Sequence, residues 1–383
     1  MKKQSFLFSI AAAALLGGAA GSLSGLCGPF TDTAADGFCS SVQEIFYLAI
    51  TSGTTATTYS PGDNANRLQM AAFLSRSVDR SLQRAGRRAA LGRFWSPKSA
   101  VVLGKTALGG SPNNVRWDGQ DVWVPNRSSA SIARVRTGDG RLLQTWTGAS
   151  VANDAVVAMG RIFVDGYTIP GRLYRIDPAA SPGAVTVLAT NLGDAADGIA
   201  FDGGRIWTAN QGASVSIVTP GPSVPWTVTT VAIGAAPTGI LFDGTAMWVT
   251  DYTNGNLLRL NGGATVLQTI PVGAGAAFPA SDGANLWVPL NGGAATAVVR
   301  ASTGTILATL TGNGQIFPNT AAFDGERILV TNANGDSVSL WKAADLTPLG
   351  SVATGVSTYP AGVCSDGINF WITLVSSGQL ARF

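Results

Sequence analysis

The sequence of 383 residues contains no histidine and only two glutamates, Glu44 and Glu326. Without an imidazole, the chain cannot build a Ser-His-Asp or Cys-His nucleophile, a histidine general base or a histidine-ligated metal site. Charged residues make up 12% of the chain, against a usual share of about 25%. The formal net charge is only +3, which argues against strong nucleic-acid binding by the whole chain.

The first twenty residues have the pattern of a secretory signal peptide. Lys2 and Lys3 precede an apolar run from Phe6 to about Ala20, and small residues follow. The run is shorter than the ~20 apolar residues that span a bilayer, and no later segment has that character. We therefore expect residues 1–20 to be removed and the protein to be secreted, periplasmic or at the cell surface, with no membrane span.

Cysteine is scarce, with three residues in the whole chain. Cys27 and Cys39 are twelve residues apart at the edges of one small module, and an exported protein is free to form disulfides. We expect these two to be bridged. Cys364 lies in an apolar strand pattern with no partner for nucleophilic or metal chemistry, so we expect it to be a buried small apolar residue.

Residues 21–82 are predicted to form a small helical module. Apolar residues at helical spacing predict a first helix over 37–48. Asn66, with Gln69 three positions later, predicts the start of a second helix. The second helix carries an expected apolar stripe, made of Met70, Leu74, Val78 and Leu82.

Residues 27–82 resemble a single S-layer homology module, whose pattern is roughly F-x-D, I-x-x-G, F-x-P and T-R-x-E before an apolar helix. The matching segments are Phe30-Thr31-Asp32, Ile50-Thr51-Ser52-Gly53, Tyr59-Ser60-Pro61 and Asn66-Arg67-Leu68-Gln69. The resemblance implies binding of an anionic cell-envelope polymer, with Arg67 at the position of the family's arginine. Asn66 and Gln69 replace the family's Thr and Glu, and one copy is present instead of three. The alternative is a disulfide-pinned cap or spacer beside the next domain.

A basic stretch follows this module. Residues 76–98 carry seven basic side chains and one acidic side chain. Arg76, Arg80 and Arg84 are spaced by four and share one helical face. Together with Arg67 they are the candidate envelope-binding residues, through contact with an anionic polymer, lipid or surface. The alternative is a solvated helix tail that continues into a linker at 83–98.

The remaining chain, residues 99–383, repeats one pattern seven times. In six copies an Asp-Gly turn precedes an aromatic or aliphatic residue by a few positions, as at Asp243-Gly244 and Trp248, and a worn copy has Met159-Gly160 with Phe163. The anchors recur every 39 to 43 residues, at 118, 159, 202, 243, 282, 324 and 366. Strands are predicted at 238–242, 247–250, 257–260 and 265–269. Four strands in about 40 residues are typical of one propeller blade.

The fold class predicted is all-β: a seven-bladed β-propeller of four-stranded blades, preceded by the helical module. The last repeat has only three strands, whereas the segment 100–106 matches the fourth strand of the other repeats. We expect 100–106 to pair with 378–383 and close the ring, which leaves no long open edge. The anchor aspartates are interpreted as turn formers, and the repeated tryptophans as core between blades.

The repeats resemble YVTN-type and NHL-like propellers over residues 99–383. This superfamily includes exported binding propellers and streptogramin-lyase-like enzymes. The lyase resemblance implies a catalytic histidine with a metal nearby, and the chain has no histidine.

Polar residues at the loop ends of the blades are the candidate ligand-binding residues. One set lies three residues after the aromatic or aliphatic anchor of its blade and consists of Asn126, Asn210, Asp251 and Asn332. The loops that enter the blades add Asn113, Asn153, Asp154, Asp197, Asn319 and Tyr359. Converging amides and carboxylates are suited to a sugar, a peptide or Ca²⁺. The alternative is that these side chains only stabilise turns.

Together these features favour an exported binding or scaffolding platform. We expect no cofactor other than a Ca²⁺ ion at the polar loop ends. The expected partner is a cell-envelope polymer or an extracellular protein or glycan. The alternative function is a propeller hydrolase or lyase that uses carboxylates or a divalent metal without histidine. Asp154, Asp165, Asp197 and Asp251 are its available carboxylates, but no spacing marks a pair of them.

Overall fold

The computed structural model describes residues 29–33, 39–47, 50–84, 104–234 and 236–383. The chain divides into two compact units, Met1–Arg93 and Phe94–Phe383, and each is described by itself. The signal peptide expected at 1–20, Cys27 and most of the linker expected at 83–98 lie outside the described residues. The signal peptide and the Cys27–Cys39 bridge therefore stay predictions. No helix in the described ranges is long and apolar enough to cross a bilayer.

The first unit contains the two predicted helices, α2 (Cys39–Tyr47) and α3 (Arg67–Arg84). Its small core is centred on Phe30, which is fully buried. The Phe30 ring lies edge-on to Phe46 at 5.2 Å and tilted against Tyr59 at 5.5 Å. Val42 of α2 completes this cluster.

The start of α3 is a reciprocal capping box. The Asn66 Oδ1 atom accepts the Gln69 amide at 2.9 Å, and the Gln69 Oε1 atom accepts the Asn66 amide at 2.8 Å. Two of the amides that a helix start leaves unpaired are thereby satisfied. The predicted helix start is confirmed.

The apolar stripe predicted on α3 is wrong for two of its members. Met70 is 49% and Leu74 is 61% exposed, whereas Phe73 is half-buried. The helix is turned so that Arg76 faces the unit, where its Nη1 atom donates to the carbonyl of Ile50 at 3.1 Å. The side chains of Val78 and Leu82 lie outside the described residues.

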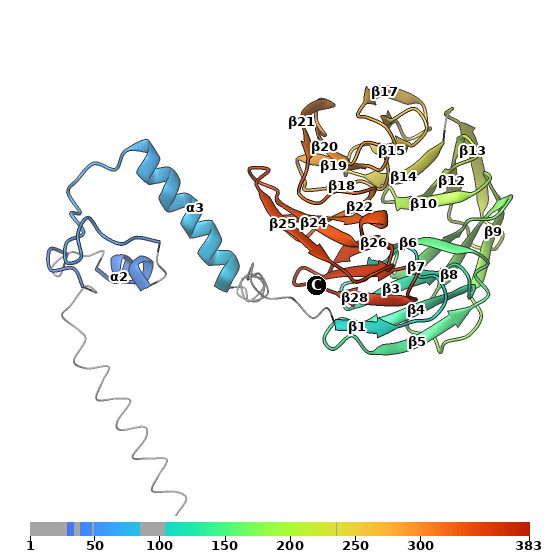
Figure 1. Ribbon diagram of the computed structural model, residues 1–383, viewed down its shortest axis with the longest axis horizontal. Helices are drawn as coiled ribbons and strands as arrows, with labels where there is room; N and C mark the ends of the chain where they lie inside the picture. Colours follow the sequence, from blue (N-terminus) through green and yellow to red (C-terminus); the bar gives the residue numbers. More distant parts are fainter. Residues whose placement is uncertain (1–28, 34–38, 48–49, 85–103, 235) are drawn as a thin grey trace, which may run out of the picture. The chain divides into compact units, whose positions relative to one another are not determined.

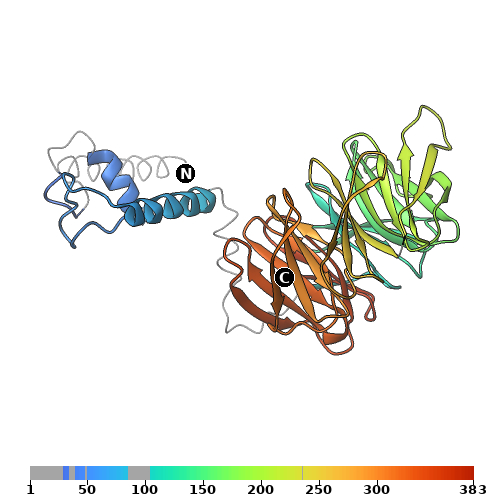
Figure 2. The ribbon, with the colours of Figure 1, turned by 90° about the horizontal axis from the view of Figure 1, so that it is seen from above.

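The second unit is a seven-bladed β-propeller, as predicted. Seven four-stranded antiparallel sheets follow one another along the chain; Figure 1 shows them arranged in sequence order around a ring, and Figure 2 shows the same ribbon from above. Blade 1 contains β2 (Arg116–Trp117), β3 (Asp121–Asn126), β4 (Ser131–Arg136) and β5 (Leu142–Thr147). Blade 2 contains β6 (Ala152–Ala158), β7 (Arg161–Gly166), β8 (Gly171–Ile176) and β9 (Thr186–Leu192). Blade 3 contains β10 (Ala196–Phe201), β11 (Ile206–Asn210), β12 (Ser214–Thr219) and β13 (Thr227–Ala232).

The next three blades repeat this order. Blade 4 contains β14 (Pro237–Phe242), β15 (Met247–Asp251), β16 (Asn256–Leu260) and β17 (Val266–Pro271). Blade 5 contains β18 (Ala280–Ser281), β19 (Asn285–Leu290), β20 (Ala295–Arg300) and β21 (Thr305–Thr311). Blade 6 contains β22 (Pro318–Phe323), β23 (Arg327–Asn332), the short 3₁₀ turn η1 (Ala333–Gly335), β24 (Ser337–Lys342) and β25 (Pro348–Ala353).

The seventh blade closes the ring with strands from both ends of the propeller. It contains β26 (Pro360–Ser365), β27 (Phe370–Leu374) and β28 (Gln379–Arg382), and its outer strand is β1 (Gly104–Ala107). β1 pairs antiparallel with β28, with Lys105 opposite Ala381. The predicted closure is confirmed for 104–107, and residues 100–103 lie outside the described ranges.

The Asp-Gly turns are held by a repeated contact to the tryptophan five residues later. Asp243 Oδ1 accepts the amides of Thr245 and Ala246, and its Oδ2 accepts the Trp248 indole N–H at 2.7 Å. Burial raises the pKa of Asp243, but these donors outweigh it and the net pKa is lowered. The same Asp–Trp pair recurs in four other blades, as Asp118–Trp123, Asp202–Trp207, Asp282–Trp287 and Asp366–Trp371.

The apolar core lies between neighbouring blades. One cluster joins Trp123 and Trp146 of blade 1 to Ile162, Val164 and Tyr174 of blade 2. The five paired tryptophans are at most 1% exposed. The aspartates are therefore turn formers and the tryptophans inter-blade core, as interpreted from the sequence. Cys364 is buried in the cluster that joins blades 7 and 1, also as expected.

Candidate ligand-binding site at the channel mouth

The inner strand of each blade begins at the same end of the propeller. At this end the first residue of the inner strand, or the residue just before it, pairs with a residue of the second strand. That partner lies three positions past the aromatic anchor; in blade 4, Pro237 pairs with Asp251, three residues after Trp248. The residue directly after this paired residue of the inner strand occupies an equivalent position in all seven blades. It is occupied by Asn113, Asn153, Asp197, Thr238, Ala277, Asn319 and Ala361.

A cavity of about 760 Å³ opens at this ring of residues, which we call the channel mouth. All seven blades contribute to its lining. The lining includes the predicted Asn113, Asp197, Asn319 and Tyr359, together with Arg127 and Gln211, which were not predicted. A volume of this size suits a small ligand or the end of a larger one.

Six predicted binding residues do not line the cavity: Asn153 and Asp154, described below, and the four residues three positions past the aromatic anchors, Asn126, Asn210, Asp251 and Asn332. These four residues are at most 3% exposed and hold the turns at the mouth. Asn126 Oδ1 accepts the Ser111 amide, and Asp251 Oδ1 accepts the Asn254 amide. Asn210 donates to Ser214 and Ser216, and Asn332 donates to Ser337 and Ser339. The alternative interpretation, that they stabilise turns, describes these four side chains.

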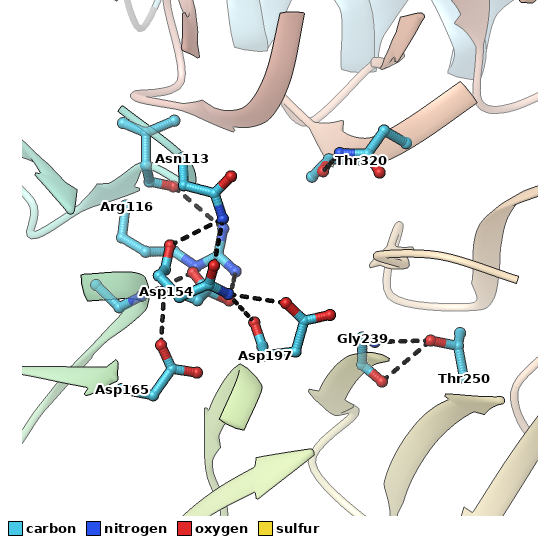
Figure 3. A network of polar contacts seen from close by, with 12 residues as sticks. Asn113, Arg116, Asp154, Asp165, Asp197, Gly239, Thr250 and Thr320 are labelled. Atoms are coloured by element: carbon cyan, nitrogen blue, oxygen red, sulfur yellow. Dashed lines mark hydrogen bonds and ion pairs between the residues drawn. The ribbon is translucent and has the colours of Figure 1, made fainter. Parts of the chain in front are cut away.

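A chain of amides and carboxylates joins the first three blades at the mouth (Figure 3). Asn113 Nδ2 donates to Asn153 Oδ1 at 2.7 Å, and Asn153 Nδ2 donates to Asp197 Oδ1 at 3.0 Å. Gln211 Nε2 donates to Asp197 Oδ2 at 2.8 Å. Burial raises the pKa of Asp197 to about 6, although these two amide donors oppose the shift.

Two further aspartates lie beside this chain and are fully buried. Asp154 Oδ2 accepts from Arg116 Nη2 at 2.7 Å, and Arg116 keeps 27% of its side chain exposed. Burial raises the pKa of Asp154 despite this ion pair. Asp165 Oδ1 accepts the Asp154 amide at 2.6 Å, and its Oδ2 has no hydrogen-bond partner in the described part of the chain. Burial and the neighbouring Asp154 raise the pKa of Asp165 well above its usual value.

Asp165 departs from a pattern that three other blades share. At the equivalent place Thr250, Thr331 and Thr373 use a hydroxyl to accept the amide of the inner strand. Two of these hydroxyls also donate to a carbonyl of the next blade, from Thr331 to Ala361 at 2.6 Å and from Thr373 to Asn113. Asp165 makes no such bond, since its Oδ2 atom has no hydrogen-bond partner in the described part of the chain.

The sequence-based reasoning missed the residues four positions past the anchor. Side chains of a strand alternate between its two faces, so the third position past the anchor faces inward and the fourth reaches the mouth. Arg127, Gln211, Tyr252 and Val375 occupy this fourth position and line the cavity. Counting four residues past each anchor instead of three would have identified these lining residues from the sequence.

Among the residues that the structure describes, no three or more aspartate, glutamate or cysteine side chains lie close enough together to hold a metal ion. The Ca²⁺ expectation therefore stays a prediction.

Comparisons with known proteins show similarity in fold. No family model and no curated protein sequence matches the chain. A catalytically inactive virginiamycin B lyase from Staphylococcus aureus, solved with quinupristin, aligns with a TM-score of 0.62 at 16% identity, over 73% of this chain and 98% of its own. A streptogramin B lyase aligns at 0.60 and 17% identity over 73% of this chain and 96% of its own. The WD40 propeller domain of Doa1 aligns at 0.59 and 13%, over 73% and 97%. At these identities, the likenesses show that the chain has a β-propeller fold and nothing finer.

Proposed function

We propose that this protein is an exported binding platform that holds an extracellular or cell-envelope ligand at the channel mouth of its propeller. The observation that supports this is the cavity of about 760 Å³ to which all seven blades contribute. Its lining combines amide and hydroxyl groups with the aromatic rings of Tyr252, Phe278 and Tyr359. Concave sites with apolar surface and a few convergent polar groups are the usual form of ligand sites.

The arrangement of carboxylates favours binding over hydrolysis. Hydrolysis of a glycosidic bond by carboxylates needs an acid and a base that both face the substrate. Among the described residues that line the cavity, Asp197 alone carries a carboxylate. Asp154 is paired with Arg116, and Asp165 is fully buried behind it. The hydrolase alternative lacks a second acid at the mouth.

Attachment to the envelope is the role we propose for the first unit. A second cavity of about 330 Å³ lies in that unit, between the loop of residues 51–65 and α3. Hydroxyl and amide side chains make up half of its lining residues, and the lining also includes Asp63 and Arg76. Arg67 is exposed at the start of the same helix. A polar cavity beside exposed arginines is suited to an anionic polymer.

The test is retention of the protein, from residue 21 onward, on purified envelope fractions. We expect Tyr359→Ala, which removes a 43% exposed ring from the mouth, to weaken retention of the propeller alone by about tenfold. Ile368→Ala in the same blade is the matched control, because Ile368 is 38% exposed and follows the Asp366-Gly367 turn at the opposite end of the strands.

Equal loss of retention in both variants, or no retention of the unaltered protein on any fraction, would contradict the proposed function. Retention of the full protein but not of residues 94–383 would assign binding to the first unit alone.

A further inference from the structure

The mouth cavity contains a cation that its neighbours do not neutralise by contact. Arg127 follows β3 and lines the cavity with a half-buried side chain. Its guanidinium lies over the Tyr167 ring, 4.3 Å from the ring centroid. No ion pair in the described part of the chain includes Arg127, whereas Arg116, the other arginine near the network, is bound to Asp154.

The contact with Tyr167 orients Arg127 without occupying the whole of its donor edge. The guanidinium lies over the ring and is also hydrogen-bonded to the Tyr167 side chain, which leaves the rest of its five N–H donors for a ligand. The Tyr167 hydroxyl donates to Gln211 Oε1 at 2.6 Å, so the ring that supports Arg127 is itself fixed. Such a pre-oriented, planar donor edge matches the two oxygens of a carboxylate.

Asp197, the carboxylate of the mouth that interacts electrostatically with Arg127, has both of its oxygens hydrogen-bonded to other residues. Asp197 accepts from Asn153 with one oxygen and from Gln211 with the other, and it is 7% exposed. The pKa of Asp197 is raised to about 6, so its charge is partly lost in mildly acidic solution. Arg127 therefore remains the group of the mouth that is best placed to attract an anion.

From this geometry we propose that the ligand is an acidic polysaccharide, bound at the mouth through a sugar carboxylate that pairs with Arg127. This inference rests on the proposed binding function and specifies its ligand class. Hydroxyl and amide groups supplied by Ser111, Asn113 and Asn319 line the same cavity and match the hydroxyl groups of sugars. Tyr252 and Tyr359 are 41% and 43% exposed and offer ring faces to a pyranose.

The test compares two polymers with one backbone. Polygalacturonate carries a carboxylate on each sugar, and its fully methyl-esterified form carries none. With the propeller of residues 94–383 immobilised, we expect polygalacturonate to bind roughly 10- to 100-fold more tightly than the ester, since a charged hydrogen-bonded pair is lost in the ester. The Arg127→Gln variant should lose this preference, and Arg127→Lys should keep only part of it because it lacks the planar donor edge.

Arg141→Gln is the matched control. Arg141 is exposed in the turn between β4 and β5, at the far end of blade 1 from the mouth. We expect this variant to bind both polymers as the unaltered propeller does. Thermal unfolding of each variant identifies any change that is due to misfolding.

Each outcome separates this inference from the proposed function. If both polymers bind equally and Tyr359→Ala weakens that binding, the carboxylate assignment is overturned while binding at the mouth is supported. Binding of polygalacturonate that Arg127→Gln and Arg141→Gln weaken equally indicates general charge attraction and also overturns the assignment. Absence of binding to either polymer overturns the choice of an acidic polysaccharide, while retention on envelope fractions still tests the proposed function.

Discussion

The two ends of the blades differ in how strictly the repeat is kept. At the Asp-Gly end, five blades make the same bond from a tryptophan N–H to an aspartate oxygen, at 2.7 or 2.8 Å. At the mouth, the equivalent ring position changes from asparagine to aspartate, threonine and alanine. The contact shared by five blades stabilises the ring, and the position that varies from blade to blade is available to a ligand.

The mouth itself has two unlike sides. Blades 1–3 supply the linked chain of Asn113, Asn153 and Asp197, with the Arg116–Asp154 pair behind it. Blades 4, 6 and 7 use threonine hydroxyls such as Thr250 to hold the inner strand. The polar and charged chemistry is thus concentrated on one side of a ring whose backbone is nearly symmetric.

The ring closure predicts the largest effect on stability. A propeller of residues 108–383 lacks β1, so β28 becomes an open edge that loses its four paired residues. At roughly 1 kcal/mol for each backbone bond, we expect a loss on the order of 4 kcal/mol relative to residues 94–383, together with aggregation. Urea unfolding and size-exclusion chromatography measure both. Equal stability of the two proteins would show that β1 does not close the ring.

The Asp–Trp contact predicts the next largest effect. Asp243→Ala removes the acceptor of the Trp248 indole and of two turn amides, and we expect a loss of about 2 kcal/mol in the free energy of unfolding. Asp345→Ala is the control, because Asp345 is a half-exposed turn carboxylate with no tryptophan partner and should change stability far less. A similar loss in both variants would contradict the special role of the Asp–Trp contact.

The mouth predicts a smaller effect of opposite sign. Asp165 has a raised pKa, so the folded state keeps a proton that the unfolded chain releases above about pH 4, and stability falls as the pH rises through that window. Asp165→Thr should remove this loss and stabilise the protein at pH 7 by about 1 kcal/mol, with a smaller gain at pH 4. Chemical unfolding at both pH values measures the difference.

The reverse exchange in blade 6 is the control for that prediction. Thr331→Asp should destabilise the protein at pH 7, because Thr331 donates to the Ala361 carbonyl at 2.6 Å and an ionised carboxylate does not. Destabilisation by Asp165→Thr at pH 7 would instead mean that the buried carboxylate of blade 2 contributes to the fold.

The repeat made the propeller predictable, but the same regularity hid the site. The Asp-Gly turns, the buried tryptophans and the closing strand all follow from spacing along the chain, because each blade solves the same packing problem. Asn210 and Asp251 were placed in the correct turns, yet a shift of one residue decides whether a strand side chain faces the core or the mouth. Arg127 and Tyr167 belong to different blades, and their contact depends on a distance between blades that spacing does not reveal.

Hydrogen exchange of the propeller with and without saturating polygalacturonate tests directly which end of the blades binds. We predict slower exchange at the mouth, in residues 109–115, 126–131 and 193–198, with unchanged exchange in the Asp-Gly turns at 202–205 and 243–246. Slower exchange confined to the Asp-Gly turns, or unchanged exchange at the mouth while the polymer is bound, would contradict the account.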